Sequence, residues 1–131
     1  MAIKTLIDTS VLIEMQKHNS KVVSTFHKQI DSVQISRIAA CEIVLGSRDR
    51  KERRINLNFI DSMDIVEINK EISLLAFNLI IKYGLKTRLG IADALIAATA
   101  IINKNLLWTM DTKHFTPVKE LNLFIPKNPS N

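Results

Sequence analysis

Apolar residues follow two alternating patterns along this chain. Short continuous runs rich in Ile, Leu and Val are typical of buried strands. They predict strands at residues 3–7, 33–36, 63–68, 106–110 and 123–125. Between these runs, apolar residues recur every three or four positions, which is the spacing of an amphipathic helix. It predicts helices starting at residue 9 or 10, over 20–30, from 39 to 45, in a segment ending near 60, from 69 to 84, and over 91–103.

Alternation of strands with helices predicts an α/β fold, in which a mostly parallel sheet has helices on both faces and right-handed connections. Thr9 or Ser10 is expected to cap the first helix. Gly84 is expected to end the longest helix in a left-handed conformation. Ligands of such sheets bind beyond the carboxyl ends of the strands. A functional site is therefore expected there.

The 131 residues suit one compact domain, with residues 127–131 as a frayed tail. Hydrophobic residues make up 47% and charged residues 24%, the balance of a folded, water-soluble protein. Cys41 is the only cysteine, so we expect no internal disulfide and a reducing compartment, the cytoplasm. The longest apolar stretch contains Asp93 and is too short for a membrane span, so no membrane association is expected.

Two acidic residues occupy positions where the helical pattern calls for apolar side chains. The neighbours of Asp93 on its own helix face are all apolar: Leu89, Ile96, Ala97 and Ala100. Those of Glu42 are similar: Ile38, Ala39, Leu45 and Gly46. A buried carboxylate without a partner costs several kcal/mol, so these two acids are expected to have a compensating partner.

Two further acids, Asp8 and Asp111, stand at or just past the ends of predicted apolar strands. In a parallel sheet both strand ends lie on one edge, so these acids can converge with Glu42 and Asp93. Four carboxylates that close cannot all remain ionised without a cation. Because the set contains only oxygen ligands, the pattern favours Mg²⁺ or Mn²⁺ over zinc. Each acid taken singly has an ordinary alternative as a helix cap or turn residue.

Four segments, 6–13, 39–43, 90–98 and 107–115, carry these acids in order, and with them the chain resembles the PIN-domain ribonucleases. Within that family it is similar to the toxins of VapBC toxin–antitoxin modules. The resemblance implies a three-layer PIN-like fold, a five-stranded sheet in the order 3-2-1-4-5, and an acidic pocket at its carboxyl edge. It also implies that Asp8, Glu42, Asp93 and Asp111 are the metal-binding and catalytic residues. Thr9, Ser10 and Thr109 would supply supporting hydroxyl groups.

By the same resemblance the chain would be an Mg²⁺- or Mn²⁺-dependent endoribonuclease that hydrolyses RNA phosphodiesters with metal-activated water. Its partners would be RNA, a VapB-like antitoxin covering the pocket, and a second copy of itself in a homodimer. One departure concerns Asp111, because many members have Asn there, so its contact with the metal can be through water. His114, three residues further on, is expected in a turn with a structural role.

The net charge is +5, and setting aside the four proposed site acids leaves 18 basic residues against nine acids, a surface that favours a polyanion. Candidate RNA contacts are the cations near the pocket or in the basic segment after Gly46: Arg88, Lys86, Arg48, Arg50 and Arg53. A solvated helix face or a protein contact is the alternative for the basic segment.

Three other classes of protein are the alternatives to this one. A haloacid-dehalogenase-like phosphoryl transferase needs a second Asp two residues after the first, where Ser10 stands. A receiver-like domain needs a strand-end lysine, for which Lys119 and Lys127 are poor fits. A non-catalytic RNA-binding or protein-interaction module on the same fold remains as the alternative, although it would not need the acid quartet.

Overall fold

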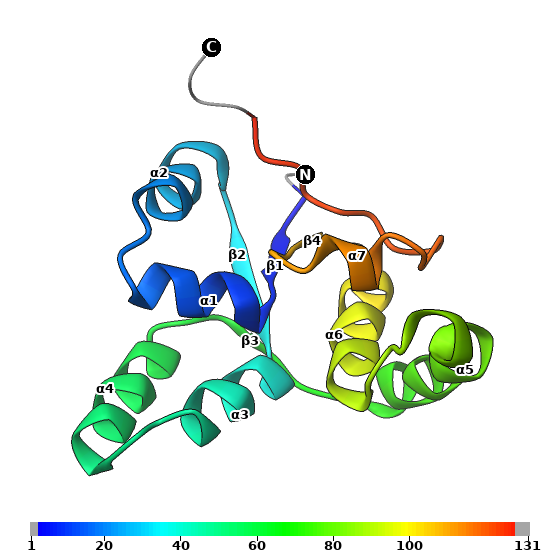
Figure 1. The fold of residues 1–131 in the computed structure, drawn as a ribbon, viewed down its shortest axis with the longest axis horizontal. Helices are drawn as coiled ribbons and strands as arrows, with labels where there is room; N and C mark the ends of the chain where they lie inside the picture. Colours follow the sequence, from blue (N-terminus) through cyan, green and yellow to red (C-terminus); the bar gives the residue numbers. More distant parts are fainter. Residues whose placement is uncertain (1–2, 128–131) are drawn as a thin grey trace.

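The structure, a computed structural model, describes residues 3–127. Its strands are β1 (Thr5–Ile7), β2 (Val33–Ser36), β3 (Ile65–Val66) and β4 (Leu106–Trp108). Its helices are α1 (Thr9–Gln16), α2 (Ser20–Gln29), α3 (Arg37–Leu45), α4 (Arg50–Asp61), α5 (Lys70–Thr87), α6 (Ile91–Ile102) and α7 (Thr112–Phe115). The predicted alternation of strands and helices is confirmed along the described chain (Figure 1).

The strands form one parallel sheet in the order β3-β2-β1-β4. β1 is central, with Thr5 opposite Val33 of β2 and Leu106 of β4. A fifth strand was predicted beside β4, but there Leu123 makes only an isolated parallel bridge to Leu107. Beyond this bridge the chain continues through Phe124 and Ile125 to Pro126, which has no backbone N–H to donate to a neighbouring strand. The expected strand order is thus kept with four strands among residues 3–127.

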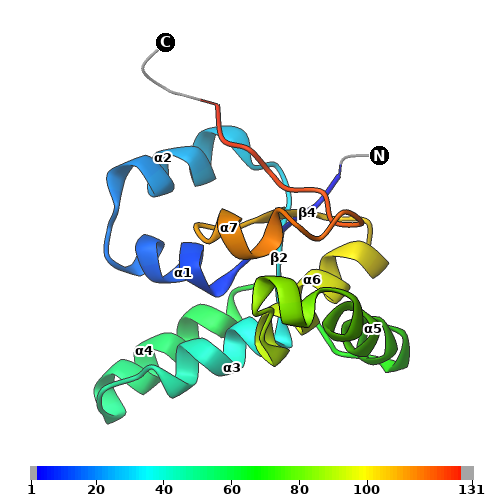
Figure 2. The same ribbon diagram turned by 45° about the vertical axis from the view of Figure 1, so that its right-hand side comes forward.

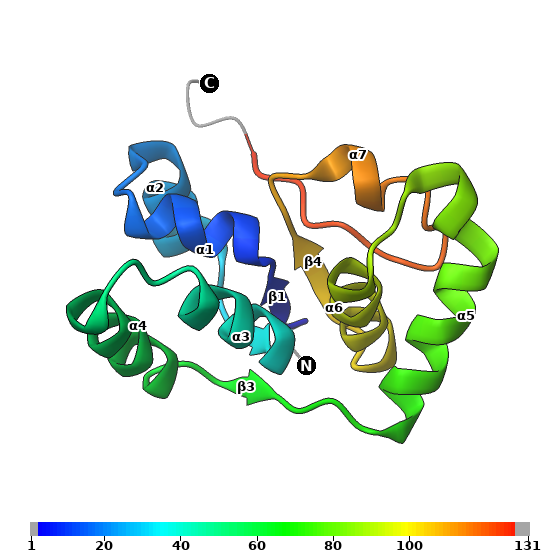
Figure 3. The same cartoon turned by 60° about the horizontal axis from the view of Figure 1, so that its bottom comes forward.

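Helices cover both faces of the sheet, as predicted. Successive strand residues point to opposite faces, so Leu6 and Leu107 pack with α5 and α6. Ile7 and Trp108, one position further along, pack with α1 to α4. Figure 3 shows α6 between β4 and α5, and Figure 2 shows α1 beside α3 and α4. The result is a three-layer arrangement with an apolar core on each side of the sheet.

Two predicted helix ends are wrong. α5 does not stop at Gly84 but continues to Thr87, and Arg88 takes the left-handed conformation, with φ 55°. The extra turn is held by the N–H of Arg88, which donates to the carbonyl of Gly84 at 3.1 Å. At the start of α1, Asp8 is the N-cap residue, and neither Thr9 nor Ser10 caps the helix. Their hydroxyl groups are used instead in the acidic site.

No helix within residues 3–127 is long and apolar enough to cross a membrane. The predicted frayed tail begins at Lys127, whose backbone N–H donates to Oε1 of Gln29 at 2.8 Å. Its carbonyl accepts from Nε2 of the same side chain at 3.1 Å. Lys127 is therefore tied to α2, while residues 128–131 of that tail lie outside the described residues.

Candidate active site

Asp8 directly follows β1 at the carboxyl edge of the sheet and is only 5% exposed. Two hydroxyl groups donate to the same carboxylate oxygen, Oδ2: that of Ser10 at 2.6 Å and that of Thr109 at 2.8 Å. Within residues 3–127, no group donates a hydrogen bond to the other oxygen, Oδ1. The carboxylate is thus fixed through one oxygen, and the other remains available to a ligand.

The two hydroxyl groups also join the strand end of β4 to α1. Ser10 Oγ accepts from the N–H of Met110 at 2.9 Å while it donates to Asp8. Thr109 Oγ1 accepts from the N–H of Asp111 at 2.9 Å while it donates to Asp8. Each hydroxyl therefore has a defined donor direction, and the backbone leading to Asp111 is held against the first turn of α1.

Glu42 lies on α3, where Oε1 accepts a hydrogen bond from the hydroxyl of Thr9 at 2.7 Å. The prediction that its carboxylate is buried on an apolar stripe is wrong, because Glu42 is exposed. Its neighbour Leu45 is 84% exposed, so the stripe reaches the surface, and α3 packs through Ala39 and Ile43 instead. Cys41, beside Glu42, is also exposed.

Asp93 lies in the first turn of α6, with its side chain 31% exposed. The helix neighbours Leu89, Ile96, Ala97 and Ala100 are buried, as the pattern predicted. Burial raises the pKa of Asp93, and the negative charges of Asp8 and Asp111 raise it further. His114 lowers the pKa of Asp93, and Glu42 raises it through a smaller charge repulsion. The other three acids are therefore close enough to Asp93 to repel its charge.

Asp111 follows β4 and is the N-cap residue of α7, a short helix that the sequence did not predict. His114 lies in this helix, and its Nδ1 is 2.8 Å from Oδ2 of Asp111 and 3.9 Å from Oδ2 of Asp93. One ligand atom from each of these three residues lies within 4.8 Å of the others. Sequence reasoning assigned His114 a structural role. Its spacing of three residues from Asp111 would have indicated this proximity had the helix been predicted.

These residues fit a divalent cation. Carboxylates of Asp8, Asp93 and Asp111 approach from two strand ends and one helix, and the pKa of Asp93 is raised by burial and then by the other two. A cation would relieve this repulsion, and carboxylate oxygens are the ligands that Mg²⁺ and Mn²⁺ prefer. Glu42 lies outside the group of closely spaced ligand atoms formed by Asp93, Asp111 and His114, as does Asp8. Both contribute to the same charge environment.

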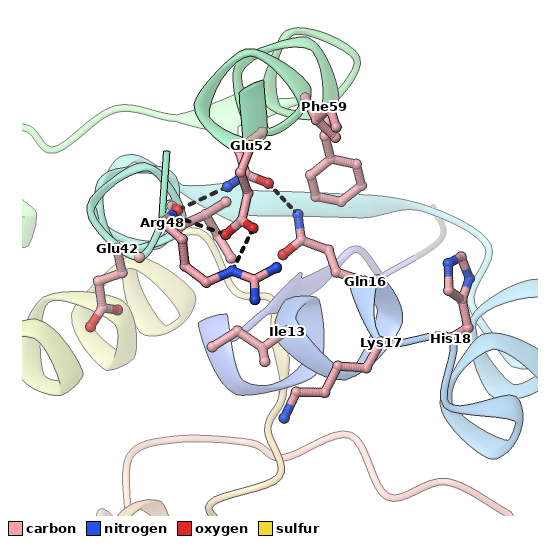
Figure 4. Close-up of a pocket in the computed structure, with 12 residues that line it drawn as sticks. Ile13, Gln16, Lys17, His18, Glu42, Arg48, Glu52 and Phe59 are labelled. Atoms are coloured by element: carbon pink, nitrogen blue, oxygen red, sulfur yellow. Dashed lines mark hydrogen bonds and ion pairs between the residues drawn. The ribbon is translucent and has the colours of Figure 1, made fainter. Parts of the chain in front are cut away.

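A pocket of about 740 Å³ opens between α1, α3 and α4, with Glu42 at one end and His18 at the other (Figure 4). Its walls are apolar, from Ile13, Ile43, Ile55 and Phe59. Arg48 and Glu52 pair across 2.9 Å at its edge. The pocket therefore connects an apolar surface to one residue of the acidic site.

The candidate RNA-contacting cations fall into two groups. Arg48, Arg50 and Arg53 lie at or just before the start of α4, where Arg48 is paired with Glu52. Lys86 lies in the last turn of α5, and Arg88 follows the helix, five residues before Asp93. Within residues 3–127, all of these except Arg48 lack an ion pair. Their charges are therefore free to meet an anion.

Comparison with known proteins agrees with this fold. The family model described as the PIN domain matches residues 5–120. Because the match covers most of the sequence, the chain belongs to the PIN-domain family, as its motifs predicted. It is 36% identical over 124 residues to Ribonuclease VapC1 of Methanocaldococcus jannaschii, which covers 93% of this chain and 86% of the relative.

Solved structures share the fold at lower sequence identity. A toxin–antitoxin complex from Klebsiella pneumoniae has a TM-score of 0.79 and 22% identity, covering 95% of this chain and 99% of that one. DNA-bound VapBC from Salmonella typhimurium has a TM-score of 0.80 and 19% identity, covering 94% and 98%. The predicted PIN-like architecture is thereby confirmed.

Proposed function

We propose that this chain is a metal-dependent endoribonuclease and the toxin of a toxin–antitoxin pair. The observation that carries the proposal is the convergence on Asp93 of charge from Asp8, Asp111 and Glu42, because a protein has little reason to keep four acids together without a cation. The kinship with Ribonuclease VapC1 indicates RNA as the substrate. Both Mg²⁺ and Mn²⁺ suit the donor set.

In this proposal Asp8, Asp93 and Asp111 hold the cation, and Ser10 and Thr109 fix the orientation of Asp8. When bound, the cation neutralises charge on the phosphoryl oxygens and lowers the pKa of coordinated water. Asp111 contacts the cation directly or through a bound water molecule.

Glu42 has a different part in the proposal, because Thr9 occupies its Oε1 and the side chain is exposed. Its Oε2 is then available to take a proton from the attacking water at the mouth of the site. No histidine base is required for this step. Thr9 holds the carboxylate in place for it.

The RNA backbone is proposed to contact Lys86 and Arg88, which come just before the helix that carries Asp93. These cations have no competing ion pair within residues 3–127, so contact with phosphate costs no existing salt bridge. Arg50 and Arg53 extend the basic surface along α4, and Arg48 lies where α4 meets the pocket.

An antitoxin segment is proposed to occupy the pocket of Figure 4. Its apolar walls suit the apolar side of a helix or an extended segment, and Lys17 and Arg48 at its edge suit acidic side chains. A segment lying there would pass Glu42 and block the acidic site. The Klebsiella pneumoniae, Rickettsia felis and Salmonella typhimurium neighbours are structures of toxin–antitoxin or VapBC complexes, which supports this kind of partner.

The pair would act in the cytoplasm, where the exposed thiol of Cys41 stays reduced.

A homodimer is proposed to form through α5. Its outward face carries a continuous apolar stripe at helical spacing: Leu74 (55% exposed), Phe77 (62%), Ile81 (66%) and Leu85 (100%). The opposite face, with Leu79 and Tyr83, is buried in the core. A stripe of this kind left in water is a common mark of a protein interface.

The decisive experiment is RNA cleavage by the purified chain with Mg²⁺, with Mn²⁺ and with excess EDTA. Asp93→Asn keeps the shape of the side chain and removes its charge. Asp31→Asn is the matched control, because Asp31 is an exposed residue in the loop before β2, at the opposite edge of the sheet. We expect cleavage by wild type and Asp31→Asn only with a cation, and a loss of at least about 100-fold in Asp93→Asn.

Cleavage that survives both EDTA and Asp93→Asn would contradict the proposal, since it would come from another site or a contaminant. A wild-type chain that binds neither cation and cuts no RNA would instead support a non-catalytic RNA-binding or protein-interaction module. Filter binding to the same RNA would then separate these two remaining classes.

A further inference from the structure

His114 is placed unusually for a histidine beside an acidic site. Its Nδ1 lies 2.8 Å from Oδ2 of Asp111 and 3.9 Å from Oδ2 of Asp93. The side chain is 45% exposed, yet this nitrogen is itself buried and has no hydrogen-bond partner within residues 3–127. A buried polar atom without a partner is costly and calls for an explanation.

The short distance to Asp111 is not explained by a hydrogen bond. The nitrogen and the carboxylate oxygen are close enough for one, but their mutual orientation does not satisfy it. Two ligand atoms of one cation lie close together without pointing at each other. Nδ1 of His114 and Oδ2 of Asp111 are arranged in this way. In an octahedral site with bonds of about 2.1 Å, adjacent ligands are about 3.0 Å apart and opposite ligands about 4.2 Å.

One of the two observed separations corresponds to this geometry. The 2.8 Å between His114 and Asp111 is close to that of adjacent ligands, and the 3.9 Å between His114 and Asp93 lies between the adjacent and opposite values. The three residues come from α6 and from the N-cap and helical turn of α7, so both elements would be joined by one ion. The backbone at Asp111 is already held by Thr109, which limits rearrangement.

We propose that Nδ1 of His114 is a direct ligand of the cation held by Asp93 and Asp111, and that the site therefore selects Mn²⁺ over Mg²⁺. This inference rests on the proposed function and makes its metal specific. Mg²⁺ binds almost entirely to oxygen, whereas first-row transition ions gain affinity from an imidazole nitrogen. The proposed ligand set contains one nitrogen together with carboxylate oxygens, in place of the all-oxygen set that the sequence predicted.

Pulsed electron paramagnetic resonance of the full chain loaded with Mn²⁺ tests the ligand directly. We expect nitrogen coupling from one imidazole in wild type, a changed coupling pattern when histidine is labelled with ¹⁵N, and no imidazole coupling in His114→Asn. His27→Asn is the matched control, since His27 is exposed on α2. Wild-type Mn²⁺ spectra without imidazole coupling would overturn the proposal, and this readout does not depend on the variant folding.

Direct titration of both ions provides the second measurement. We expect His114→Asn to weaken Mn²⁺ binding by about tenfold or more and Mg²⁺ binding by about twofold or less. Equal weakening of both ions would assign His114 a role in packing or charge rather than in ligation, and would overturn the proposal.

The outcomes also separate this inference from the proposed function. Absence of imidazole coupling, together with metal-dependent RNA cleavage by wild type, would refute the His114 ligand alone. Absence of Mn²⁺ binding and of RNA cleavage would refute both. Imidazole coupling without RNA cleavage would support the ligand and refute the nuclease.

Discussion

The hydroxyl of Thr109 donates a hydrogen bond to Oδ2 of Asp8 at 2.8 Å, although the two residues are 101 positions apart in the sequence. It joins the carboxyl ends of the adjacent parallel strands β1 and β4. The same oxygen of Asp8 also accepts from Ser10, so two donors fix one buried carboxylate. Ligand orientation at the proposed metal site therefore depends on the pairing of these two strands.

Replacing Thr109 with valine removes this hydroxyl and preserves the shape of the side chain. We expect cation affinity, or cleavage at limiting cation, to fall by about 10- to 100-fold, because a partner that orients a metal ligand is lost. Thr109→Ser keeps the donor and should remain within a few-fold of wild type. Isothermal titration with Mn²⁺ compares the three proteins. Equal affinity of wild type and Thr109→Val would show that Ser10 alone suffices.

Asp93→Asn is expected to stabilise the metal-free protein while abolishing its function. The folded-state pKa of Asp93 is raised by burial and then by Asp8 and Asp111, so the fold favours the protonated form. Its contribution to stability is fully present below the ordinary pKa of an aspartate and is lost as the pH rises through the raised value. At pH 7 in EDTA the variant should therefore melt about 2–5 °C above wild type.

The advantage of the variant should shrink as the pH falls through the raised pKa of Asp93, where Asp93 of wild type becomes protonated as well. Saturating Mg²⁺ should reverse the order at pH 7, because only wild type keeps the full ligand set. Thermal unfolding over this pH range measures both effects. A variant that melts below wild type in EDTA at pH 7 would show that Asp93 is stabilised by something other than a cation.

The exposed stripe of α5 predicts the effect of a charge on self-association. Ile81 is 66% exposed within the stripe, and in a symmetric dimer Ile81→Lys would place two charges in one apolar interface. We expect the dimer to weaken by at least about 100-fold. Light scattering after size-exclusion chromatography measures the mass. Asn58→Lys, at an exposed position on α4 away from the stripe, is the control and should stay dimeric. A monomeric wild type at tens of micromolar would refute the interface.

Tyr83→Phe tests how the C-terminal segment is attached to α5. The buried Tyr83 hydroxyl donates to Glu120 and accepts from the N–H of Lys119, and its hydrogen bond is the main cause of the lowered pKa of Glu120. A lowered pKa contributes stability above the ordinary value, and this is lost as the pH falls through the folded-state value. We expect a loss of about 1 kcal/mol at pH 7, since Glu120 is partly solvated.

Urea unfolding at pH 7 and pH 3 measures this difference, which should become smaller at pH 3. Glu120→Gln should show the same reduced pH dependence with the phenol still present. A cost for Tyr83→Phe that is the same at both pH values would assign the effect to the contact with Lys119 instead.

The bounds of β2 and α6, which the local pattern of apolar residues encodes, were predicted closely. β2 was predicted at residues 33–36 and observed as Val33–Ser36, and α6 ends one residue before its predicted end. Their apolar residues are buried on the face that the spacing indicates, so local sequence and tertiary packing agree. The lengths of β3 and of the fifth strand were overestimated. The length of a strand depends on how far its neighbour can pair with it, and local hydrophobicity does not encode this.

By itself the sequence determined the alternating α/β architecture and indicated four candidate site acids, because acids on apolar stripes or at strand ends break the pattern around them. Only the tertiary structure decided how those acids differ: Asp8 is buried between two hydroxyl groups, whereas Glu42 is exposed. It also decided that His114 lies beside Asp111, and that one apolar side of α5 faces water. Periodicity identifies which residues share a face, but whether that face is covered depends on chain segments far away in the sequence.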